Sequence, residues 1–344
     1  KGLVFIDLRD RYGMTQVVFD GEDSPESVME LGATLRREDV ISVEGTIRVR
    51  DGKSNVKLAT GDIELVAQKI EVINRTAKLP ILPDDHDADE IGEEHRLRHR
   101  YIDLRRPRMQ KILALRHRIT QFTRNFFADN GFLEIETPLL ITPTPEGARD
   151  FIVPSRHQVG HWYALPQSPQ IFKQILMVAG CDKYMQICKC LRDEDPRADR
   201  QAEFTQIDLE MSFVEQDDVL ELTEGLYTSL IETLMPQKRL MKPFPRLTYQ
   251  QAMDRFATDK PDLRFGLEMS DLSKIAANAE FKVFSSAVED GGIVKGFSVP
   301  GLGGYPRRQL DELVDFTKSR GARGLVYIAL NEDAGSIDDL AEGQ

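Results

Sequence analysis

The sequence predicts an α+β protein with a small N-terminal β-barrel, a core built on an antiparallel sheet, and the start of a further α+β unit. Short runs of alternating apolar residues dominate the first 75 residues, and a long amphipathic helix follows at 108–130. Alternation returns in two arms that flank the charged stretch 190–212, which is typical of two strands joined by a loop. The 344 residues suffice for two or three domains. The expected parts are a barrel at 1–75, a linker or hinge at 76–107, a core at 108–264 and the second α+β unit at 265–344.

The first part of the chain is predicted to be a barrel of the OB type. Strands are expected at 3–7 and 15–19, a helix at 25–38, and longer strands at 40–49 and 62–73. Strands interrupted by one helix are typical of the small barrels that bind oligonucleotides. On this interpretation the first strand of the barrel is missing from the chain.

Two features of the composition bear on nucleic-acid binding. The net charge of −12 argues against nonspecific binding over the whole surface. Residues 95–118 nevertheless hold nine Lys or Arg against one acidic residue, which favours a local phosphate-facing surface over a merely solvated helix face. Phe5 could stack on an unpaired base if it lies on the barrel face. From the pattern alone, however, a core position for Phe5 is favoured.

The rest of the chain is predicted to alternate between strands and helices. The helix at 108–130 stops at an Asn-Gly pair, which commonly ends helices. No run of 18 apolar residues is present, so no membrane span is expected. The later elements are strands at 132–137, 184–191, 204–213, 280–284, 293–299 and 324–330, and helices at 218–235 and 307–320.

The three cysteines, Cys181, Cys188 and Cys190, fall in one region of the chain. Cys188 and Cys190 should share one face of a strand, because side chains two residues apart point the same way. A zinc site would need a fourth ligand and a more usual spacing. We therefore favour buried structural thiols in a reducing cytoplasm and assign no metal ligands.

Four stretches carry a family resemblance. They are YIDLRRP at 101–107, TPEGARDFIVPS at 144–155, LPQSPQIFKQ at 165–174 and RDEDPRADRQAEFTQIDLE at 192–210. Together with the helix that ends in NGFLEIETP, they resemble motifs 1 and 2 of the class II aminoacyl-tRNA synthetases, and most closely the bacterial aspartyl enzymes. The resemblance covers almost the whole chain. It implies an anticodon-binding barrel, a class II antiparallel-sheet catalytic core, and the start of the domain that is inserted in the bacterial enzymes.

The chain also departs from the family pattern. The GxGxGxDR-type motif 3, with its second ATP-binding arginine, is absent, and so are a late histidine and the aspartate-binding arginine. The chain lacks an initiator Met and begins inside a predicted strand. We therefore expect a protein truncated at both ends.

The resemblance implies an ATP site around the motif 2 loop. Arg192 would be the catalytic residue that holds the α-phosphate, and Glu194 would accept a hydrogen bond from the adenine amino group. Phe204 would stack on adenine, and Asp193 and Gln201 would complete the ATP contacts. Alone, Arg192 and Glu194 would more simply form a salt bridge across one strand face.

The resemblance also implies a pocket for aspartate. Lys173 would pair with the side-chain carboxylate, whereas Asp208 and Glu146 would hold the ammonium, Glu146 from a loop that closes over the substrate. Lys173 is also compatible with an ordinary helix lysine whose amine reaches water. The full assignment is Glu146, Ser168, Gln170, Ile171, Phe172, Lys173, Arg192 and Asp208.

The implied function is ATP-dependent ligation of L-aspartate to tRNA(Asp) through an aspartyl-adenylate. Mg²⁺ would accompany ATP, Phe5 and Gln16 would contact tRNA, and a homodimer would form through the motif 1 helix at 108–130. One alternative is a relative that also charges tRNA(Asn). Asparaginyl and lysyl synthetases are disfavoured because TPEGARD and QSPQIFK fit the aspartyl enzyme better. A non-catalytic tRNA-binding fragment is the alternative outside the enzymes, and the missing motif 3 favours it.

Overall fold

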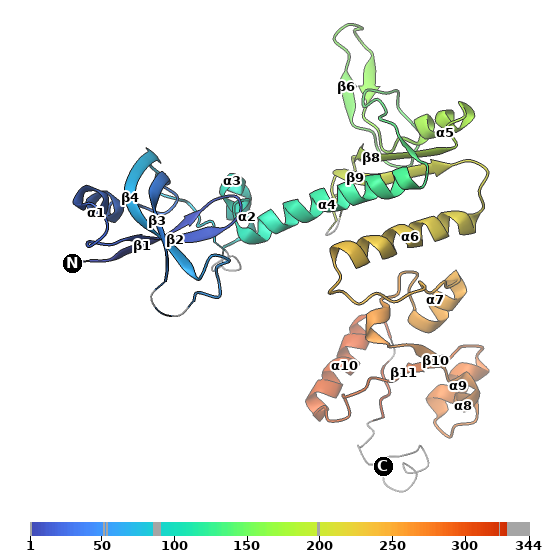
Figure 1. Ribbon diagram of the computed structural model, residues 1–344. Helices are drawn as coiled ribbons and strands as arrows, with labels where there is room; N and C mark the ends of the chain where they lie inside the picture. Colours follow the sequence, from blue (N-terminus) through green and yellow to red (C-terminus); the bar gives the residue numbers. More distant parts are fainter. Residues whose placement is uncertain are drawn as a thin grey trace. The chain divides into compact units, whose positions relative to one another are not determined.

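The computed structural model describes residues 2–50, 52, 54–84, 91–197, 200–322 and 324–328 (Figure 1). Contacts divide the chain into two units, Lys1–Lys238 and Arg239–Gln344. Within the described ranges, no helix combines the length and the apolar character needed to cross a membrane.

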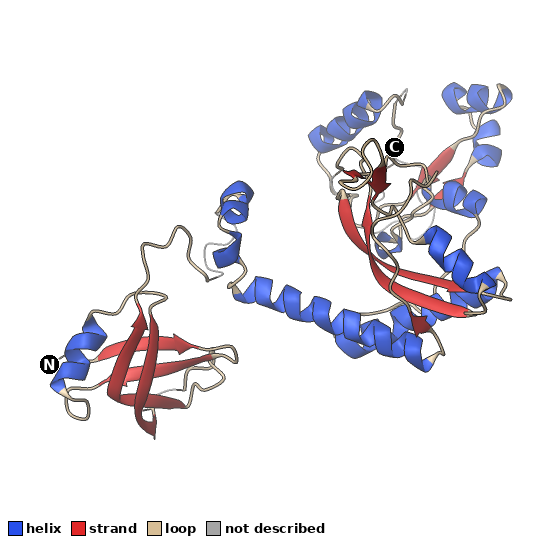
Figure 2. Ribbon diagram, turned by 90° about the horizontal axis from the view of Figure 1, so that it is seen from above, coloured by secondary structure: helices blue, strands red, loops and turns tan. Residues whose placement is uncertain are grey.

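The N-terminal part is a four-stranded sheet with one helix against it (Figure 2). The strands follow the order β1-β2-β4-β3, with β2 and β4 parallel and the outer pairs antiparallel. This arrangement agrees with the predicted OB-type fold. The elements are β1 (Val4–Arg9), β2 (Met14–Phe19), α1 (Glu26–Ala33), β3 (Val40–Val49) and β4 (Ile63–Asn74).

One face of this sheet forms an apolar core with α1. Val17, Phe19, Val28 and Ala67 are buried there. Gly32 of α1 is required for this packing, because a Cβ atom at that position would lie 2.7 Å from the Phe19 ring. The core fixes which side chains of β1 and β2 remain on the opposite face.

Helix α1 is shorter than predicted, ending at Ala33 instead of residue 38. The Asp39 carboxylate accepts a hydrogen bond from the Arg36 backbone N–H at 3.0 Å. Such local side-chain acceptors compete with helical hydrogen bonds. Glu38 also has a positive φ of 69°, which a right-handed helix excludes.

The predicted linker at 76–107 contains two short helices, α2 (Glu93–Arg98) and α3 (Arg100–Asp103). Asp103 is fully buried and pairs with three arginines, at 3.0 Å from Arg96, 2.6 Å from Arg100 and 3.3 Å from Arg106. Burial alone would raise the pKa of the Asp103 carboxyl, but Arg96 and Arg100 outweigh it and hold the pKa below its usual value. Part of the basic stretch is therefore structural.

The core that follows is a three-stranded sheet in the order β5-β8-β9, with α4 and α6 on one face and α5 on the other. Phe127, Phe132, Met185 and Leu226 are buried between the sheet, α4 and α6. The strand predicted at 132–137 is only two residues long, and irregular chain follows from residue 135. The elements are α4 (Pro107–Asp129), β5 (Leu133–Glu134), β6 (Ile152–Pro154), β7 (Trp162–Ala164), α5 (Gln170–Val178), β8 (Lys183–Leu191), β9 (Glu203–Met211) and α6 (Gln216–Leu234).

The second unit is a mixture of short helices and a two-stranded antiparallel sheet. The strand predicted at 293–299 contains β11, and the helix predicted at 307–320 is α10. The elements are α7 (Tyr249–Phe256), a 3₁₀ turn (Leu263–Phe265), β10 (Met269–Asp271), α8 (Ser273–Ala277), α9 (Lys282–Glu289), β11 (Lys295–Phe297) and α10 (Arg307–Ser319).

Two strand predictions in this unit were wrong within the described residues. The segment 280–284 begins helix α9, because Phe281, Phe284 and Val288 recur at helical spacing and the two Phe rings pack edge to face at 5.1 Å. Residues 324–328 form no strand, and 329–330 lie outside the described residues.

Candidate active site

The β8–β9 hairpin positions the residues predicted for ATP. The two strands pair antiparallel over their whole length, with Cys190 opposite Phe204 and Gln186 opposite Asp208. The ladder continues beyond β8, because the Arg192 backbone N–H donates to the Ala202 carbonyl at 2.8 Å. Arg192 is therefore fixed at the rigid end of a strand pair rather than in a free loop.

A cavity of about 310 Å³ lies at this end of the hairpin. Its lining includes four of the five residues predicted to bind ATP, and it is completed by Asp195, Pro196 and Arg200. The fifth, Asp193, lines a neighbouring cavity of about 660 Å³ together with Gly147 and Glu194. The four that share the first cavity are Arg192, Glu194, Gln201 and Phe204.

The Arg192 guanidinium lies against the Phe204 ring and retains an unused hydrogen-bond donor. Its guanidinium carbon lies 5.2 Å from the centre of the Phe204 ring. Its buried Nε has no hydrogen-bond partner in the described part of the chain. No ion pair with Glu194 is found among the described residues, so the simple salt-bridge alternative is not what the structure contains there.

Lys173 of α5 is buried against the same hairpin. Its Nζ donates to Asp208 Oδ1 at 2.9 Å and lies 3.3 Å from Glu210 Oε2. Burial would lower the pKa of this ammonium, but the hydrogen bonds and charges of Asp208 and Glu210 outweigh it and raise the pKa above the usual value. Lys173 is therefore not a surface lysine with its amine in water. Its place in α5 is near Gln170, but neither residue lines the 310 Å³ cavity.

Two carboxylates predicted for the aspartate pocket keep one oxygen each without a partner. Asp208 Oδ2 and Glu146 Oε1 are buried and accept no hydrogen bond within the described ranges. The other oxygen of Glu146 accepts from Ser168 Oγ at 2.8 Å. Of the remaining predicted residues, Ile171 is exposed and Phe172 is half-buried. The orphan oxygens are acceptors that an ammonium group would satisfy.

The residue Gln167 was missed by the sequence predictions. It is buried, and its amide closes a pair of hydrogen bonds with the Ala148 backbone, at 3.1 Å and 2.9 Å. Gln167 also donates to Asp150. The TPEGARD loop is thereby anchored on its C-terminal side. The signal was present in QSPQIFK, where Gln167 lies one residue before the predicted Ser168.

Comparison with known families decides which class of protein this is. A family model described as tRNA synthetases class II (D, K and N) matches residues 92–323, and one for the OB-fold nucleic acid binding domain matches residues 1–73. The chain belongs to the class II tRNA synthetases. The predicted family and fold class are thus confirmed.

Among individual proteins, this chain is similar to enzymes named for aspartate. A Thermoanaerobacter sp. (strain X514) protein named Aspartate--tRNA(Asp/Asn) ligase is 54% identical over 333 residues, which are 96% of this chain and 55% of the relative. A protein of the same name from Rubrobacter xylanophilus is 52% identical over 329 residues, 95% of this chain and 54% of the relative. The chain spans about half the length of these curated relatives.

Solved structures support the fold of this synthetase. The crystal structure of asparaginyl-tRNA synthetase from Pyrococcus horikoshii complexed with asparaginyl-adenylate matches with a TM-score of 0.63 at 22% identity. The match covers 83% of this chain and 65% of that one. At this identity the similarity establishes the fold.

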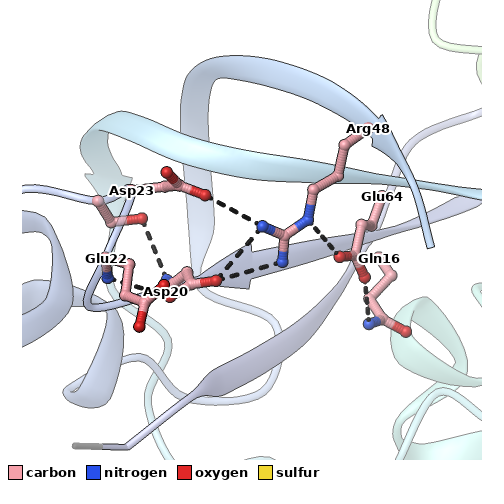
Figure 3. Close-up of polar contacts among 7 residues, drawn as sticks. Gln16, Asp20, Glu22, Asp23, Arg48 and Glu64 are labelled. Atoms are coloured by element: carbon pink, nitrogen blue, oxygen red, sulfur yellow. Dashed lines mark hydrogen bonds and ion pairs between the residues drawn. The ribbon is translucent and has the colours of Figure 1, made fainter. Parts of the chain in front are cut away.

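The N-terminal sheet of this synthetase carries the two residues predicted to contact tRNA. Phe5 lies on β1 opposite Val18 and is 55% exposed, so the core position favoured from the pattern was wrong. Gln16 donates to the buried Glu64 at 3.2 Å (Figure 3). Arg48 holds the other oxygen of Glu64 at 2.8 Å and also pairs with Asp20 (Figure 3).

Glu64 was the second residue that the sequence predictions missed. Its DIELV context predicts only a strand, and nothing in the pattern shows that its carboxylate joins two strands by binding Gln16 and Arg48. The effect is to fix the amide of Gln16 on the sheet face that carries Phe5.

Proposed function

We propose that this synthetase joins L-aspartate to ATP as aspartyl-adenylate and then transfers the aspartyl group to tRNA(Asp). The main support for the proposal is the position of Arg192. The β8–β9 ladder fixes its backbone beside a cavity that Glu194, Gln201 and Phe204 also line. A nucleotide could bind here, with its phosphate against the fixed guanidinium and its base against the aromatic ring. The names of the relatives support the same reaction.

In the first step the α-carboxylate of aspartate attacks the α-phosphorus of ATP. A new oxygen–phosphorus bond forms, the bond to the bridging oxygen breaks, and pyrophosphate leaves with its electron pair. Negative charge grows on the α-phosphate oxygens, where the Arg192 guanidinium would donate hydrogen bonds. Each charge-assisted hydrogen bond is worth roughly 1.5–3 kcal/mol. No general base is needed, because the attacking carboxylate is already ionised.

The adenine end of ATP would bind in the same cavity. Phe204 offers a ring on which adenine can stack. Glu194 lines the cavity as a hydrogen-bond acceptor suited to the exocyclic amino group, and Gln201 offers both a donor and an acceptor. Together with Arg192, these groups would fix the α-phosphorus in line with the incoming carboxylate.

Aspartate would be selected by charge at both ends. Its ammonium fits the orphan acceptors Asp208 Oδ2 and Glu146 Oε1, and its side-chain carboxylate would pair with Lys173. Asparagine presents an amide in place of that carboxylate and would leave a buried ammonium without its new partner. Because Lys173 keeps Asp208 and Glu210 as partners in either case, discrimination would come from the additional ion pair that aspartate forms and asparagine cannot form.

Magnesium enters the proposal only as the ion that accompanies ATP. Among the described residues, no group of three or more His, Cys, Asp or Glu side chains could hold a metal ion. Mg²⁺ commonly binds through substrate phosphates and water with few protein ligands.

The tRNA and a second subunit would use two further surfaces. Phe5 would stack on an anticodon base, beside the Gln16 amide that Glu64 orients. The exposed apolar residues Ile112 and Leu113 of the motif 1 helix α4 favour a homodimer through that helix. The reaction would take place in the cytoplasm, where tRNA is charged.

A second candidate function is charging of both tRNA(Asp) and tRNA(Asn). The printed names of the two relatives favour it, because both name the pair Asp/Asn. Aminoacylation of the two purified tRNAs with labelled aspartate separates the candidates. Charging of tRNA(Asn) at a rate within tenfold of that for tRNA(Asp) would establish the broader activity.

The proposal as a whole is tested by aspartate-dependent exchange of pyrophosphate into ATP, with the protein in its natural flanking sequence. Exchange with aspartate, and at least a hundredfold less with asparagine, is expected. Binding of tRNA without any exchange would favour the non-catalytic tRNA-binding alternative.

A further inference from the structure

Two cysteines form a buried dithiol in the β8–β9 hairpin. Cys188 and Cys190 lie two residues apart on β8, and their Sγ atoms are 3.7 Å apart. Cys188 is 4% exposed and Cys190 is fully buried. The third cysteine, Cys181, lies outside the strand and is partly exposed. The contact between the two thiols is a property of this pair alone.

Cys190 shares one face of the hairpin with two residues that line the candidate nucleotide cavity. Cys190 is opposite Phe204 in the ladder and two residues from Arg192, so all three belong to one face of the hairpin. Cys190 Sγ also donates to Gln206 Oε1 at 3.1 Å. A group bound to the two sulfurs would therefore lie close to Arg192 and Phe204, which line the cavity.

The two thiols do not ionise equally. The hydrogen bond between the two thiols lowers the pKa of Cys188 below the usual thiol value. The neighbouring sulfur and burial raise the pKa of Cys190. Since the thiolate is the nucleophile, Cys188 is the sulfur that would react first and Cys190 the one that would follow.

The ligand set does not fit structural zinc and fits an element that needs only two protein sulfurs. Structural zinc takes four protein ligands, and no group of three candidate ligands occurs in the described residues. Trivalent arsenic is thiophilic, bonds covalently to two neighbouring thiols and can retain a hydroxyl as its third substituent. Arsenous acid, As(OH)₃, is also small and uncharged at neutral pH, which suits a buried pair.

The geometry points to Cys188 and Cys190 as a binding site for trivalent arsenic whose occupation inhibits adenylate formation. Each thiol replaces one hydroxyl: As(OH)₃ and two S–H groups give a dithio-arsenous hydroxide, (RS)₂As–OH, and two molecules of water. Two arsenic–sulfur bonds form, two arsenic–oxygen bonds break, and each thiol proton leaves with a hydroxyl. No oxidant is consumed. The binding stands on the two sulfurs alone, whereas the inhibition rests on the proposed function.

Binding is tested first, without reference to activity. The protein is equilibrated with arsenite in the presence of excess glutathione, and native mass spectrometry counts the arsenic atoms per chain. One arsenic is expected on the wild-type protein and on the matched control Cys181→Ala, and none on Cys188→Ala or Cys190→Ala. Circular dichroism confirms that each variant is folded. A wild-type protein without arsenic, or a folded Cys188→Ala variant that keeps it, would overturn the site.

Inhibition is tested on the same samples by aspartate-dependent pyrophosphate exchange, each rate relative to that of the untreated sample. Full arsenic occupancy should lower the wild-type rate at least tenfold, and 2,3-dimercaptopropanol should restore it. Cys190→Ala should be insensitive to arsenite. An unchanged wild-type rate at full occupancy would refute the inhibition and leave the proposed function intact. An untreated protein that shows no exchange would refute the proposed function, while the mass measurement would still decide the site.

Discussion

Replacing Arg192 with alanine separates a structural role of this side chain from a role in stabilising the transition state. In the described part of the chain Arg192 makes no ion pair, and its aromatic contact is the one with Phe204 at 5.2 Å. The backbone hydrogen bond from Arg192 to Ala202 does not depend on the side chain. The Arg192→Ala variant should therefore keep the hairpin and lose the guanidinium alone.

The effect expected on folding stability and the effect expected on the reaction rate differ enough in size to be distinguished. Loss of a partly exposed cation–π contact costs about 0.5–1 kcal/mol of folding free energy. Loss of one preorganised donor to a developing anion costs about 2.7–4 kcal/mol of activation free energy, which is 10²–10³-fold in rate. We therefore expect a nearly unchanged stability and a rate of adenylate formation that falls at least a hundredfold.

The assay is aspartate-dependent pyrophosphate exchange, together with urea unfolding of the same samples. Lys189→Ala is the matched control, because Lys189 lies on the same strand and its pair with Glu203 is exposed to solvent. Lys189→Ala should exchange at the wild-type rate. Exchange by Arg192→Ala within a few-fold of wild type would refute the phosphate role, and unfolding of that variant would show a structural role instead.

Three further predictions follow from other contacts. Lys173→Met should raise the KM for aspartate far more than the KM for ATP. It should also lower the free energy of unfolding by about 3 kcal/mol, because Asp208 loses its buried partner. A second change, Asp208→Asn, should restore stability but not activity, and equal rises in KM for both substrates would indicate general damage. Phe5→Ala should weaken tRNA binding by about 1–3 kcal/mol in a filter-binding assay and leave the melting temperature unchanged, because the ring is 55% exposed. Gln16→Ala should also weaken tRNA binding. Unaltered tRNA affinity in both variants would show that this face of the N-terminal sheet does not bind tRNA. Asp103→Asn should lower the free energy of unfolding by about 3 kcal/mol near neutral pH. Because the folded pKa of Asp103 lies below its usual value of 3.8, the contribution of its carboxylate to stability is complete above pH 3.8 and disappears as the pH falls through the folded pKa. Urea unfolding at several pH values should therefore show the free energies of unfolding of wild type and Asp103→Asn converging only in acid. A constant difference between these free energies down to pH 2 would contradict this account.

Local pattern determined the fold of the barrel and the family of the core. Alternating apolar residues located β1 to β4, β8 and β9, because a half-buried strand must place apolar side chains on one face. The contiguous stretches from 144 to 210 indicated a class II synthetase, and the family match confirmed it. In the second unit the pattern was ambiguous, and a run of apolar residues at 280–284 fitted a helix as well as a strand.

Tertiary structure alone decided which partner each polar group has. Arg192 and Glu194 look like a salt bridge in the sequence, yet both line a cavity, because the ladder at Ala202 and the bridge of Asp193 to Arg149 fix the backbone there. Phe5 was predicted to be in the core and is exposed, because the register with β2 assigns it to the outer face.

Gln167, Glu64 and the Cys188–Cys190 contact were beyond the reach of sequence patterns for the same reason. The sequence by itself determined the elements, the family and the residue types that the proposed chemistry uses. Only the tertiary structure decided which side chains meet, because burial and hydrogen bonding depend on atoms that lie far apart along the chain.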